Sequence, residues 1–190
     1  ILTMQLHDAH GNRWSVDGEW SIQDAPTSQR QAIRVGDEPG TALFEGTVAG
    51  EWEVVATYAG QSYDITIEVR PGRLEKVELS GEGDVITVEE SLELQPGYFD
   101  ASGNEVTPSA IFWLSDGIDV TDEVISSNYE LIQTQAGVHT IVLSADSEIA
   151  IIRYEVVPGK CSDIITSQEV DVSVSSGETL NFGMRCRDAF

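Results

Sequence analysis

Alternation of apolar and polar residues predicts short β-strands along most of the chain. In "EWEVVATY", residues 51–58, the apolar side chains fall at every second position from Trp52 to Tyr58. This is the pattern of a strand with one buried face. Residues 61–69, "QSYDITIEV", alternate in the same way, and "AGQ" between the two segments predicts a tight turn, so the two strands should form a hairpin. No segment shows a 3.6-residue period of useful length, so no helix is predicted.

The same plan returns after about 88 residues. The segment "GVHTIVLSA" from Gly137 matches the segment from Gly50, and "SEIAIIRYEVV" follows it after the turn "DS". Two Pro-Gly pairs, in "VRPGRLEKVELS" and "VVPGKCSDIITS", stand at Pro71 and Pro158 with the same offset. Trp20 and Trp113 occupy corresponding places. Markers that recur in one order at one spacing indicate a tandem array.

Further strands are predicted for "LEKVELS", "SLELQPGYFD" and "SAIFWLS", each bounded by Gly, Pro, Asn or Asp. One period therefore holds roughly seven short strands with a turn every 8 to 12 residues, which is typical of a β-sandwich. The predicted fold class is all-β, with tandem sandwiches joined at short Pro-Gly junctions.

A pentapeptide, Asp-Ala-x-Gly-Asn, marks a strand-to-strand turn in each period. Its members are Asp8, Gly11 and Asn12 in the first copy and Asp100, Gly103 and Asn104 in the second. Asp can accept a hydrogen bond from the backbone two residues on, Gly supplies a positive φ, and Asn tolerates the left-handed region. A calcium loop is the alternative interpretation, but one carboxylate offers too few ligands.

The layout "V-x-PG-x-L-x-x-V-x-L-S … DA-x-GN-x-V … W … G-x-W-x-V-x-A-x-Y" resembles bacterial and archaeal Ig-like (Big-type) repeats of large secreted and cell-surface proteins. The resemblance covers essentially the whole chain. It implies immunoglobulin-like sandwiches, an extracellular or cell-surface location, and a role in stalks, adhesins or spacer modules. The second repeat departs from the pattern because His139 stands where the first has Trp52, so we expect its core to be filled differently there.

The repeats divide the chain into three predicted domains. Residues 1–71 form an Ig-like domain without its first strand, and residues 72–158 form a complete one. Residues 159–190 supply the first two strands of a third, ending at Asp188 where another copy of the turn begins. We therefore expect the native protein to continue in both directions.

Two cysteines flank the predicted strands of residues 159–190. Cys161 starts one strand and Cys186 ends the next, and an antiparallel hairpin brings such positions together. In a secreted protein this predicts a disulfide, worth roughly 3 kcal/mol on the chain-entropy estimate. Metal binding by two cysteines without a nearby His is disfavoured. Alternatively, this hairpin could complete the first domain of another molecule and give a strand-exchanged oligomer.

The charge balance is strongly acidic, with 33 Asp and Glu against 10 Lys and Arg and a net charge of −23. Such a chain repels phosphate backbones and anionic lipid, which excludes nucleic acid as a partner. No apolar run is long enough to cross a membrane, so no direct membrane insertion is expected. The carboxylates either keep the chain soluble in salt or bind Ca²⁺.

One acidic segment, "SDGIDVTDE", is a candidate calcium site in the complete domain. Its carboxylates are Asp116, Asp119, Asp122 and Glu123. They could converge if the loop folds back, although the EF-hand pattern is missing and a solvated loop is the alternative. No other cofactor is expected.

The histidines and motifs of the chain give no sign of catalysis. His7 and His10 flank a turn, and His139 takes a core position by alignment, so a packed side chain is expected there. Nucleophile-elbow, phosphate-loop and metal-protease patterns do not occur, and Ser115-Asp116-Gly117 lacks a partner histidine placed by the repeat. The sequence predicts a protein that is not an enzyme.

The function these patterns favour is a stalk or adhesive array in a large secreted or cell-surface protein. Its partners would be neighbouring Ig-like repeats of the same chain and a cell-surface protein or glycan. The alternatives are a spacer or carbohydrate-binding module of a secreted hydrolase, and a strand-exchanging filament subunit. A sugar platform needs exposed coplanar aromatics, and the candidates, Trp14, Tyr98, Phe99 and Tyr129, are scattered.

Overall fold

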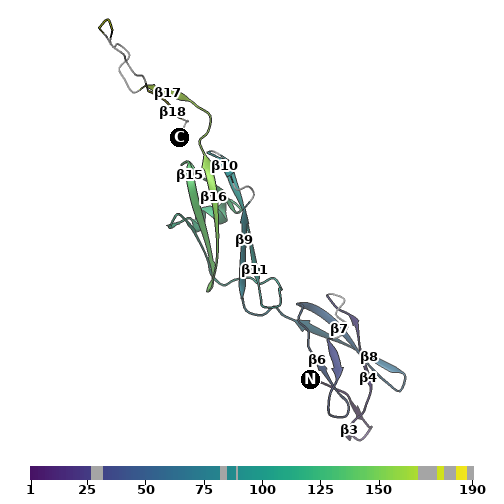
Figure 1. The fold of residues 1–190 in the computed structure, drawn as a ribbon. Coiled ribbons are helices and arrows are strands. Elements are labelled where there is room, and N and C mark those ends of the chain that lie inside the picture. The colour runs from purple at the N-terminus through teal and green to yellow at the C-terminus, as the bar shows by residue number, and fades with distance from the viewer. Residues whose placement is uncertain (27–31, 82–84, 89, 167–174, 178–182, 188–190) are drawn as a thin grey trace. The chain divides into compact units, whose positions relative to one another are not determined.

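The computed structural model describes residues 1–26, 32–81, 85–88, 90–166, 175–177 and 183–187. The described chain is almost entirely strand and turn, so the all-β class is confirmed. It forms two compact units (Figure 1). The first contains Ile1–Lys76 and Tyr98–Thr107, and the second contains Val77–Gly97 and Pro108–Phe190, so the chain passes between the units three times.

The first unit is built from two three-stranded sheets and a small hairpin. One sheet has the order β4 (Glu19–Asp24), β7 (Gly50–Tyr58), β8 (Gln61–Val69). The other has the order β1 (Leu2–Thr3), β6 (Thr41–Phe44), β5 (Ile33–Val35), and β2 (Gln5–His7) pairs with β3 (Arg13–Ser15). The inward positions of β7, Trp52, Val54 and Ala56, are buried as the alternation predicts. Phe44 of β6 contacts the Trp52 ring edge-on.

Within the described residues, the second unit contains an Ig-like sandwich with five strands in one sheet and three in the other. The larger sheet has the order β10 (Val85–Thr87), β16 (Glu148–Val157), β15 (Gly137–Ala145), β12 (Ile111–Ser115), β13 (Ile118–Asp119). The smaller has the order β14 (Glu130–Ile132), β11 (Ser91–Phe99), β9 (Lys76–Gly81). Since β9 belongs to the smaller sheet and β10 to the larger, the chain changes sheets between them, and β10 then pairs in parallel with β16.

The core of the second unit lies between these sheets. Its fully buried side chains include Trp113, Ile141 and Leu143 of the larger sheet and Leu92 of the smaller one. Burying each aliphatic side chain contributes about 1.5–3 kcal/mol. The two sheets are therefore held together by the inward half of the alternating pattern that the sequence shows.

The two long hairpins correspond residue by residue. Tyr58 pairs with Gln61 in the first, and Ala145 pairs with Glu148 in the second, so the offset of 87 is kept. Trp20 lies opposite Ala56 and Trp113 opposite Leu143, which carries the correspondence into the neighbouring strands β4 and β12. The predicted hairpins are confirmed, although the first turn contains only two residues, Ala59 and Gly60, and not three.

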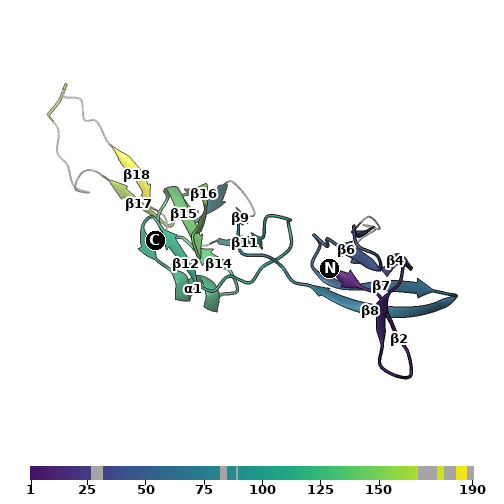
Figure 2. The ribbon, with the colours of Figure 1, turned by 90° about the horizontal axis from the view of Figure 1, so that it is seen from below.

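One short helix, α1 (Thr121–Ser126), lies in the segment predicted as an acidic loop. Figure 2 shows it beside β12 and β14, and its Val124 is fully buried. The expectation of no helix was wrong here, because six residues are too few to display a 3.6-residue period. Asp122 and Glu123 in its first turn favour the helix through the positive end of its dipole.

The predicted disulfide hairpin near the C-terminus is confirmed. β17 (Asp163–Thr166) pairs antiparallel with β18 (Met184–Arg187), and Cys161 is bonded to Cys186 with their Cα atoms 5.6 Å apart. The Arg187 guanidinium lies 3.2 Å from the Asp163 carboxylate. The third copy of the turn, from Asp188, lies outside the described residues, and the boundaries 1–71, 72–158 and 159–190 stay a prediction.

The turn of the first long hairpin predicts a stabilising substitution. Ala59 has a φ of +49° and Gly60 one of +80°, which is the left-handed backbone of a type I′ turn. Asn tolerates this region better than Ala, so Ala59→Asn should stabilise the first unit by about 0.5–1 kcal/mol. Thermal unfolding measures the change. The matched control, Gly60→Ala, meets no neighbouring atom and should lower stability through backbone strain alone. A lower Tm for Ala59→Asn would contradict the assignment.

Candidate functional site

Both copies of the Asp-Ala-x-Gly-Asn turn have the same internal hydrogen bonds. Asp8 Oδ1 accepts from the backbone N–H of His10 (2.8 Å) and of Asn12 (2.9 Å). Asp100 Oδ1 accepts from Ser102 and Asn104 at the same two distances. Gly11 and Gly103 have φ values of +83° and +82°. The predicted Asx turn with a glycine at positive φ is therefore confirmed in both places.

The role expected for the two asparagines was wrong. Neither Asn12 nor Asn104 has a positive φ. Instead the side-chain amide of Asn12 donates to Asp8 Oδ2 (2.7 Å), and that of Asn104 donates to Asp100 Oδ2 (2.8 Å). The asparagine amide thus closes the turn by binding the second carboxylate oxygen, while backbone N–H groups bind the first.

The second turn also binds a loop of the first repeat. The Asn104 amide donates to the Thr47 carbonyl (2.9 Å), and its Oδ1 accepts from the Ala49 N–H (2.7 Å). Asp100 Oδ2 accepts from the N–H of Gly72, in the first Pro-Gly pair, at 2.7 Å. All five residues belong to the first compact unit. The second repeat's turn is thus bonded into the unit built mainly by the first repeat.

The loop that receives the turn, Thr47–Ala49, is itself held by the core. The indole N–H of buried Trp52 donates to the Val48 carbonyl at 3.0 Å. The corresponding loop of the second repeat, Thr134–Ala136, shares the sequence Thr-x-Ala-Gly. There His139 Nε2 lies 2.8 Å from the Gln135 carbonyl. The residue that replaces Trp52 therefore keeps the same ring-to-carbonyl bond.

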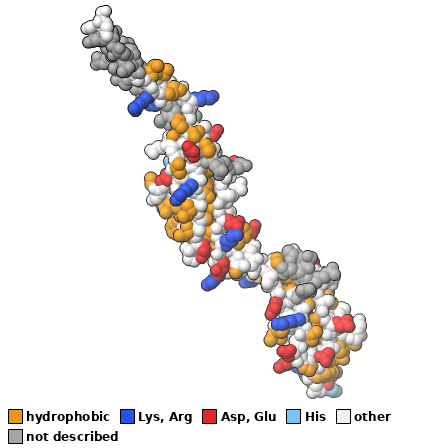
Figure 3. Space-filling model, in the orientation of Figure 1, with side chains coloured by type: hydrophobic (Ala, Val, Ile, Leu, Met, Phe, Trp, Pro, Cys, Tyr) orange, Lys and Arg blue, Asp and Glu red, His pale blue; other side chains and the backbone are white. Residues whose placement is uncertain are grey.

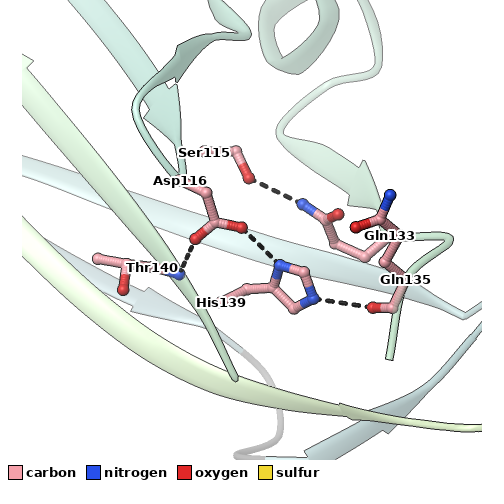
Figure 4. Close-up of polar contacts among 6 residues, drawn as sticks. All are labelled: Ser115, Asp116, Gln133, Gln135, His139 and Thr140. Atoms are coloured by element: carbon pink, nitrogen blue, oxygen red, sulfur yellow. Dashed lines mark hydrogen bonds and ion pairs between the residues drawn. The ribbon is translucent and has the colours of Figure 1, made fainter. Parts of the chain in front are cut away.

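His139 also pairs with Asp116, as Figure 4 shows. Its Nδ1 lies 2.6 Å from Asp116 Oδ2, while Asp116 Oδ1 accepts from the Thr140 N–H at 2.8 Å. The expectation that Ser115-Asp116-Gly117 has no partner histidine was wrong. The register between β12 and β15 sets Ser115 opposite Ile141, so the turn after Ser115 lies beside His139.

The arrangement around His139 is structural in its chemistry. Both ring nitrogens lie at hydrogen-bond distance from oxygen atoms, Nδ1 from the Asp116 carboxylate and Nε2 from the Gln135 carbonyl. Ser115 Oγ accepts from the Gln133 amide at 2.8 Å, and the imidazole nitrogen that a nucleophilic serine would need is bound to Gln135. A Ser-His-Asp triad is therefore not assembled here.

Charge and burial shape this cluster. The Thr140 N–H, followed by the His139 hydrogen bond, lowers the pKa of the Asp116 carboxyl. Burial raises the pKa of the Tyr154 hydroxyl, which packs with His139 at a ring separation of 5.7 Å. A cavity of about 320 Å³ lies beside the cluster and is lined by Asp116, Glu123, Gln133 and His139 among others.

The four calcium candidates are placed in different local structures. Asp116 is in the hairpin turn between β12 and β13 and binds His139. Asp119 Oδ1 accepts from the Thr121 N–H at 3.0 Å, and Asp122 and Glu123 lie in the first turn of α1. The part of the chain that the structure describes holds no group of three acidic, His or Cys side chains placed to bind a metal. Calcium binding stays a prediction.

The aromatic candidates for a sugar platform differ in exposure and come from both units. Trp14 is 47% exposed on β3. Tyr98, Phe99 and Tyr129 are only partly exposed. Two other exposed aromatics, Tyr63 of β8 and Phe112 of β12, belong to sheets of different units.

Sequence reasoning missed the receiving loop and the Asp116–His139 pair. The loop could have been found, because Thr-x-Ala-Gly recurs at the same offset of 87 as the other markers, from Thr47 to Thr134. The pair depends on the register of two strands that are distant in sequence, and no local pattern encodes it.

Comparison with known proteins gives similarity of fold. No protein-family model matches the sequence, and no curated protein matches it. Domains 4–9 of the surface layer protein SbsC match over 97% of this chain and 30% of that one, at 17% identity and a TM-score of 0.37. The Escherichia coli adhesin FdeC matches over 79% of this chain and 56% of that one, at 20% identity and a TM-score of 0.44.

The four N-terminal Ig domains of Dscam1 isoform 7.44 match over 75% of this chain and 37% of that one, at 12% identity and a TM-score of 0.39. The chain thus spans only part of each of these structures. Similarity at these levels concerns the fold alone and carries no functional conclusion. Within the described residues, no helix has the length and apolar character needed to cross a membrane.

The Asp100 turn predicts a specific acid titration. Hydrogen bonds from the Asn104 amide and then from the Gly72 N–H lower the pKa of Asp100 from 3.8 to about 2. Because the folded-state pKa is depressed, the stabilisation is present above pH 3.8 and is lost as the pH falls through about 2. Carboxyl NMR titration should show the Asp100 pKa rising toward 3.8 in Asn104→Ala. The Asp8 carboxyl of the same molecule is the internal control and should not change; a parallel change there would contradict the assignment.

The calcium prediction is tested by unfolding the protein in CaCl₂ and in MgCl₂ at matched ionic strength. A calcium site should raise the Tm of the second unit in CaCl₂ only, by the equivalent of about 2.7 kcal/mol at a hundredfold excess over Kd. Asp119→Asn combined with Asp122→Asn should abolish this difference. Identical curves for the unsubstituted protein in the two salts would contradict calcium binding and leave solubility as the role of these carboxylates.

Proposed function

We propose that this chain is a non-enzymatic structural segment of an extracellular or cell-surface protein, in which tandem Ig-like repeats act as a stalk or spacer. The observation that carries the proposal is the bond between the Asp100–Asn104 turn and the Thr47–Ala49 loop. It supports repeats that are joined by a specific polar contact as well as by the covalent chain. A stalk needs such contacts because flexible linkers alone do not fix the distance that it spans.

Each repeat carries one turn and one receiving loop, and only one pair is engaged within the described residues. Asp100 is buried, with 7% of its surface exposed, and Ala49 is partly covered. By contrast, the Asn12 end of the first turn is exposed, and the Thr134–Ala136 loop is largely so. A head-to-tail array requires complementary elements that occur once in each repeat. Here the turn of the first repeat and the receiving loop of the second are the two elements outside the engaged pair.

An extracellular location is supported by covalent chemistry and by charge. The protein has two cysteines, and they form the Cys161–Cys186 disulfide, which persists in oxidising compartments. The net charge of −23 suits a surface that stays hydrated and does not bind nucleic acid or anionic lipid. We infer neighbouring Ig-like repeats as the first partners of this segment, and a cell-surface protein or glycan as its target if it is adhesive.

The absence of an enzymatic role is supported by the His139 cluster, in which every polar atom of the imidazole is used for structure. A carbohydrate-binding role is not favoured by the dispersed aromatic side chains. A strand-exchanging filament is not required to support the terminal hairpin, because the disulfide and the Arg187–Asp163 pair already do so.

The turn-to-loop contact is tested by Asn104→Ala. Removing the side chain leaves the Ala49 N–H without its acceptor, and this should cost about 1–3 kcal/mol. Hydrogen exchange at the Ala49 amide should accelerate roughly tenfold or more, since about 1.4 kcal/mol corresponds to one factor of ten. If the contact stiffens the array, the distance distribution between labels at Ser62 and Ser147, measured by single-molecule FRET, should also broaden.

Asn12→Ala is the matched control. It removes the same amide-to-carboxylate bond inside the first turn without touching the Thr47–Ala49 loop. Exchange at Ala49 and the label distance should be unchanged in this variant. Equal effects of the two substitutions, or no effect of Asn104→Ala on the distance distribution, would contradict a stiffening role.

A further inference from the structure

The outward face of the larger sheet in the second unit is apolar, although it is exposed to solvent. Phe112 of β12 is 55% exposed, and Ile149 and Ile151 of β16 are 61% and 59% exposed. Leu114 and Val142 point to the same side and are partly exposed. Figure 3 shows hydrophobic side chains gathered over β15 and β16.

Strand register makes these residues one patch. Phe112, Ser144 and Ile149 lie in one row across β12, β15 and β16. Leu114, Val142 and Ile151 form the next row of the same face, two residues along each strand. We call these two rows, which hold five apolar side chains and Ser144, the apolar face. At about 4.8 Å between strands and 3.3 Å per residue, three strands and two rows span roughly 14 Å by 13 Å.

The first unit shows that the fold does not require this face to be apolar. The corresponding outward positions on β4, β7 and β8 follow from the two hairpin registers. They are occupied by Glu19, Ser21, Val55, Thr57, Ser62 and Asp64. Four positions that hold Phe, Leu or Ile in the second repeat hold Glu, Ser or Asp in the first. Packing of the sandwich therefore does not explain the apolar side chains.

We propose that the apolar face is a self-association surface whose occupant is the same face of a second copy of this chain. The two copies are related by a two-fold axis that lies in the plane of the interface and crosses the strands at right angles at the level of Ala150. This axis places the Ile149 row of each copy against the Ile151 row of the other copy. Each apolar row then meets an apolar row, as a self-complementary interface requires.

Charge supports a second copy as the occupant. The row that follows Leu114, Val142 and Ile151 on the same face contains Arg153 of β16, a charged side chain three residues beyond Ala150. The same axis brings Arg153 to the level of the partner's Ser147, three residues before Ala150. The partner's hairpin tip there carries Asp146, whose carboxylate accepts from the N–H groups of Ser109 and Ala110, and Glu148, which is paired with Ala145. The axis therefore brings Arg153 toward a tip with two negative charges at each end of the interface, which favours this register over a shifted one.

The interface is small, so the association is weak in dilute solution. Stable interfaces bury about 800 Å² per partner, and this face offers much less, so a dissociation constant on the order of 10⁻⁴ M is expected. Two copies with a charge of −23 each also repel one another. In 1 M salt this repulsion is screened beyond a distance of about 3 Å. Association should therefore strengthen with NaCl, as apolar contact between acidic molecules does.

The test is sedimentation equilibrium of the whole chain from about 20 µM to 1 mM in 1 M NaCl, a concentration range that brackets the expected constant. The unsubstituted protein should shift from monomer toward dimer. Ile149→Ser with Ile151→Asp introduces the residues that the first repeat carries at the same positions, and this variant should stay monomeric. Phe112→Glu, which copies Glu19 of the first repeat, is a second disrupting variant if the first unfolds. Val55→Thr, on the first repeat's face, is the control and should associate normally.

The register is tested by a charge pair. Arg153→Glu should weaken association at least tenfold, because it places a carboxylate against the acidic tip of the partner. Adding Ser147→Arg, which lies opposite residue 153 across the proposed axis, should restore most of the loss. A protein that is monomeric at 1 mM overturns the proposal, as does undiminished association of the folded Ile149→Ser, Ile151→Asp variant. Failure of Ser147→Arg to rescue overturns the proposed register.

Discussion

The structure depends on one hydrogen bond that each repeat makes between its core and the loop before its long hairpin. Trp52 Nε1 donates to the Val48 carbonyl, and His139 Nε2 lies at the same place relative to Gln135. A ring buried in the core can satisfy its polar N–H only at the edge of the core, so the loop carbonyl is fixed where the ring reaches it. That bond in turn presents the flanking backbone groups, Thr47 C=O and Ala49 N–H, to the Asn104 side chain.

The replacement of Trp by His changes what surrounds this bond. An indole has one polar atom, but an imidazole has two, and the second nitrogen of His139 needs a partner when it is buried. Asp116 supplies it, and Thr140 and His139 together keep the pKa of that carboxyl low. The acidic residue that sequence reasoning assigned to calcium is therefore used to complete a core substitution.

The sequence could predict what depends on neighbouring residues. Alternation from Trp52 to Tyr58 located a hairpin, and the Asp and Gly of the pentapeptide located the turns, because strand faces and turn dihedrals are set over two to five residues. It could not predict that Asn104 binds Ala49, a contact across 55 residues, or that Asp116 reaches His139. These depend on strand register and on how sheets close. The α1 helix was missed because its six residues are fixed by the burial of Val124 and not by a period.

A sandwich constrains only the inward half of each alternating pattern, and the two units show how much freedom remains in the outward half. The inward positions of β7 and β15 hold Trp52 and His139, Val54 and Ile141, Ala56 and Leu143, all buried. At the outward positions of the paired strands, Ser62 and Asp64 correspond to Ile149 and Ile151. A difference on the inward side reports how a core is filled. On the outward side, polar and apolar side chains both leave the fold intact, so a difference there reports what the surface contacts. In an acidic chain, an apolar sheet face is the part of the surface least suited to contact with water alone.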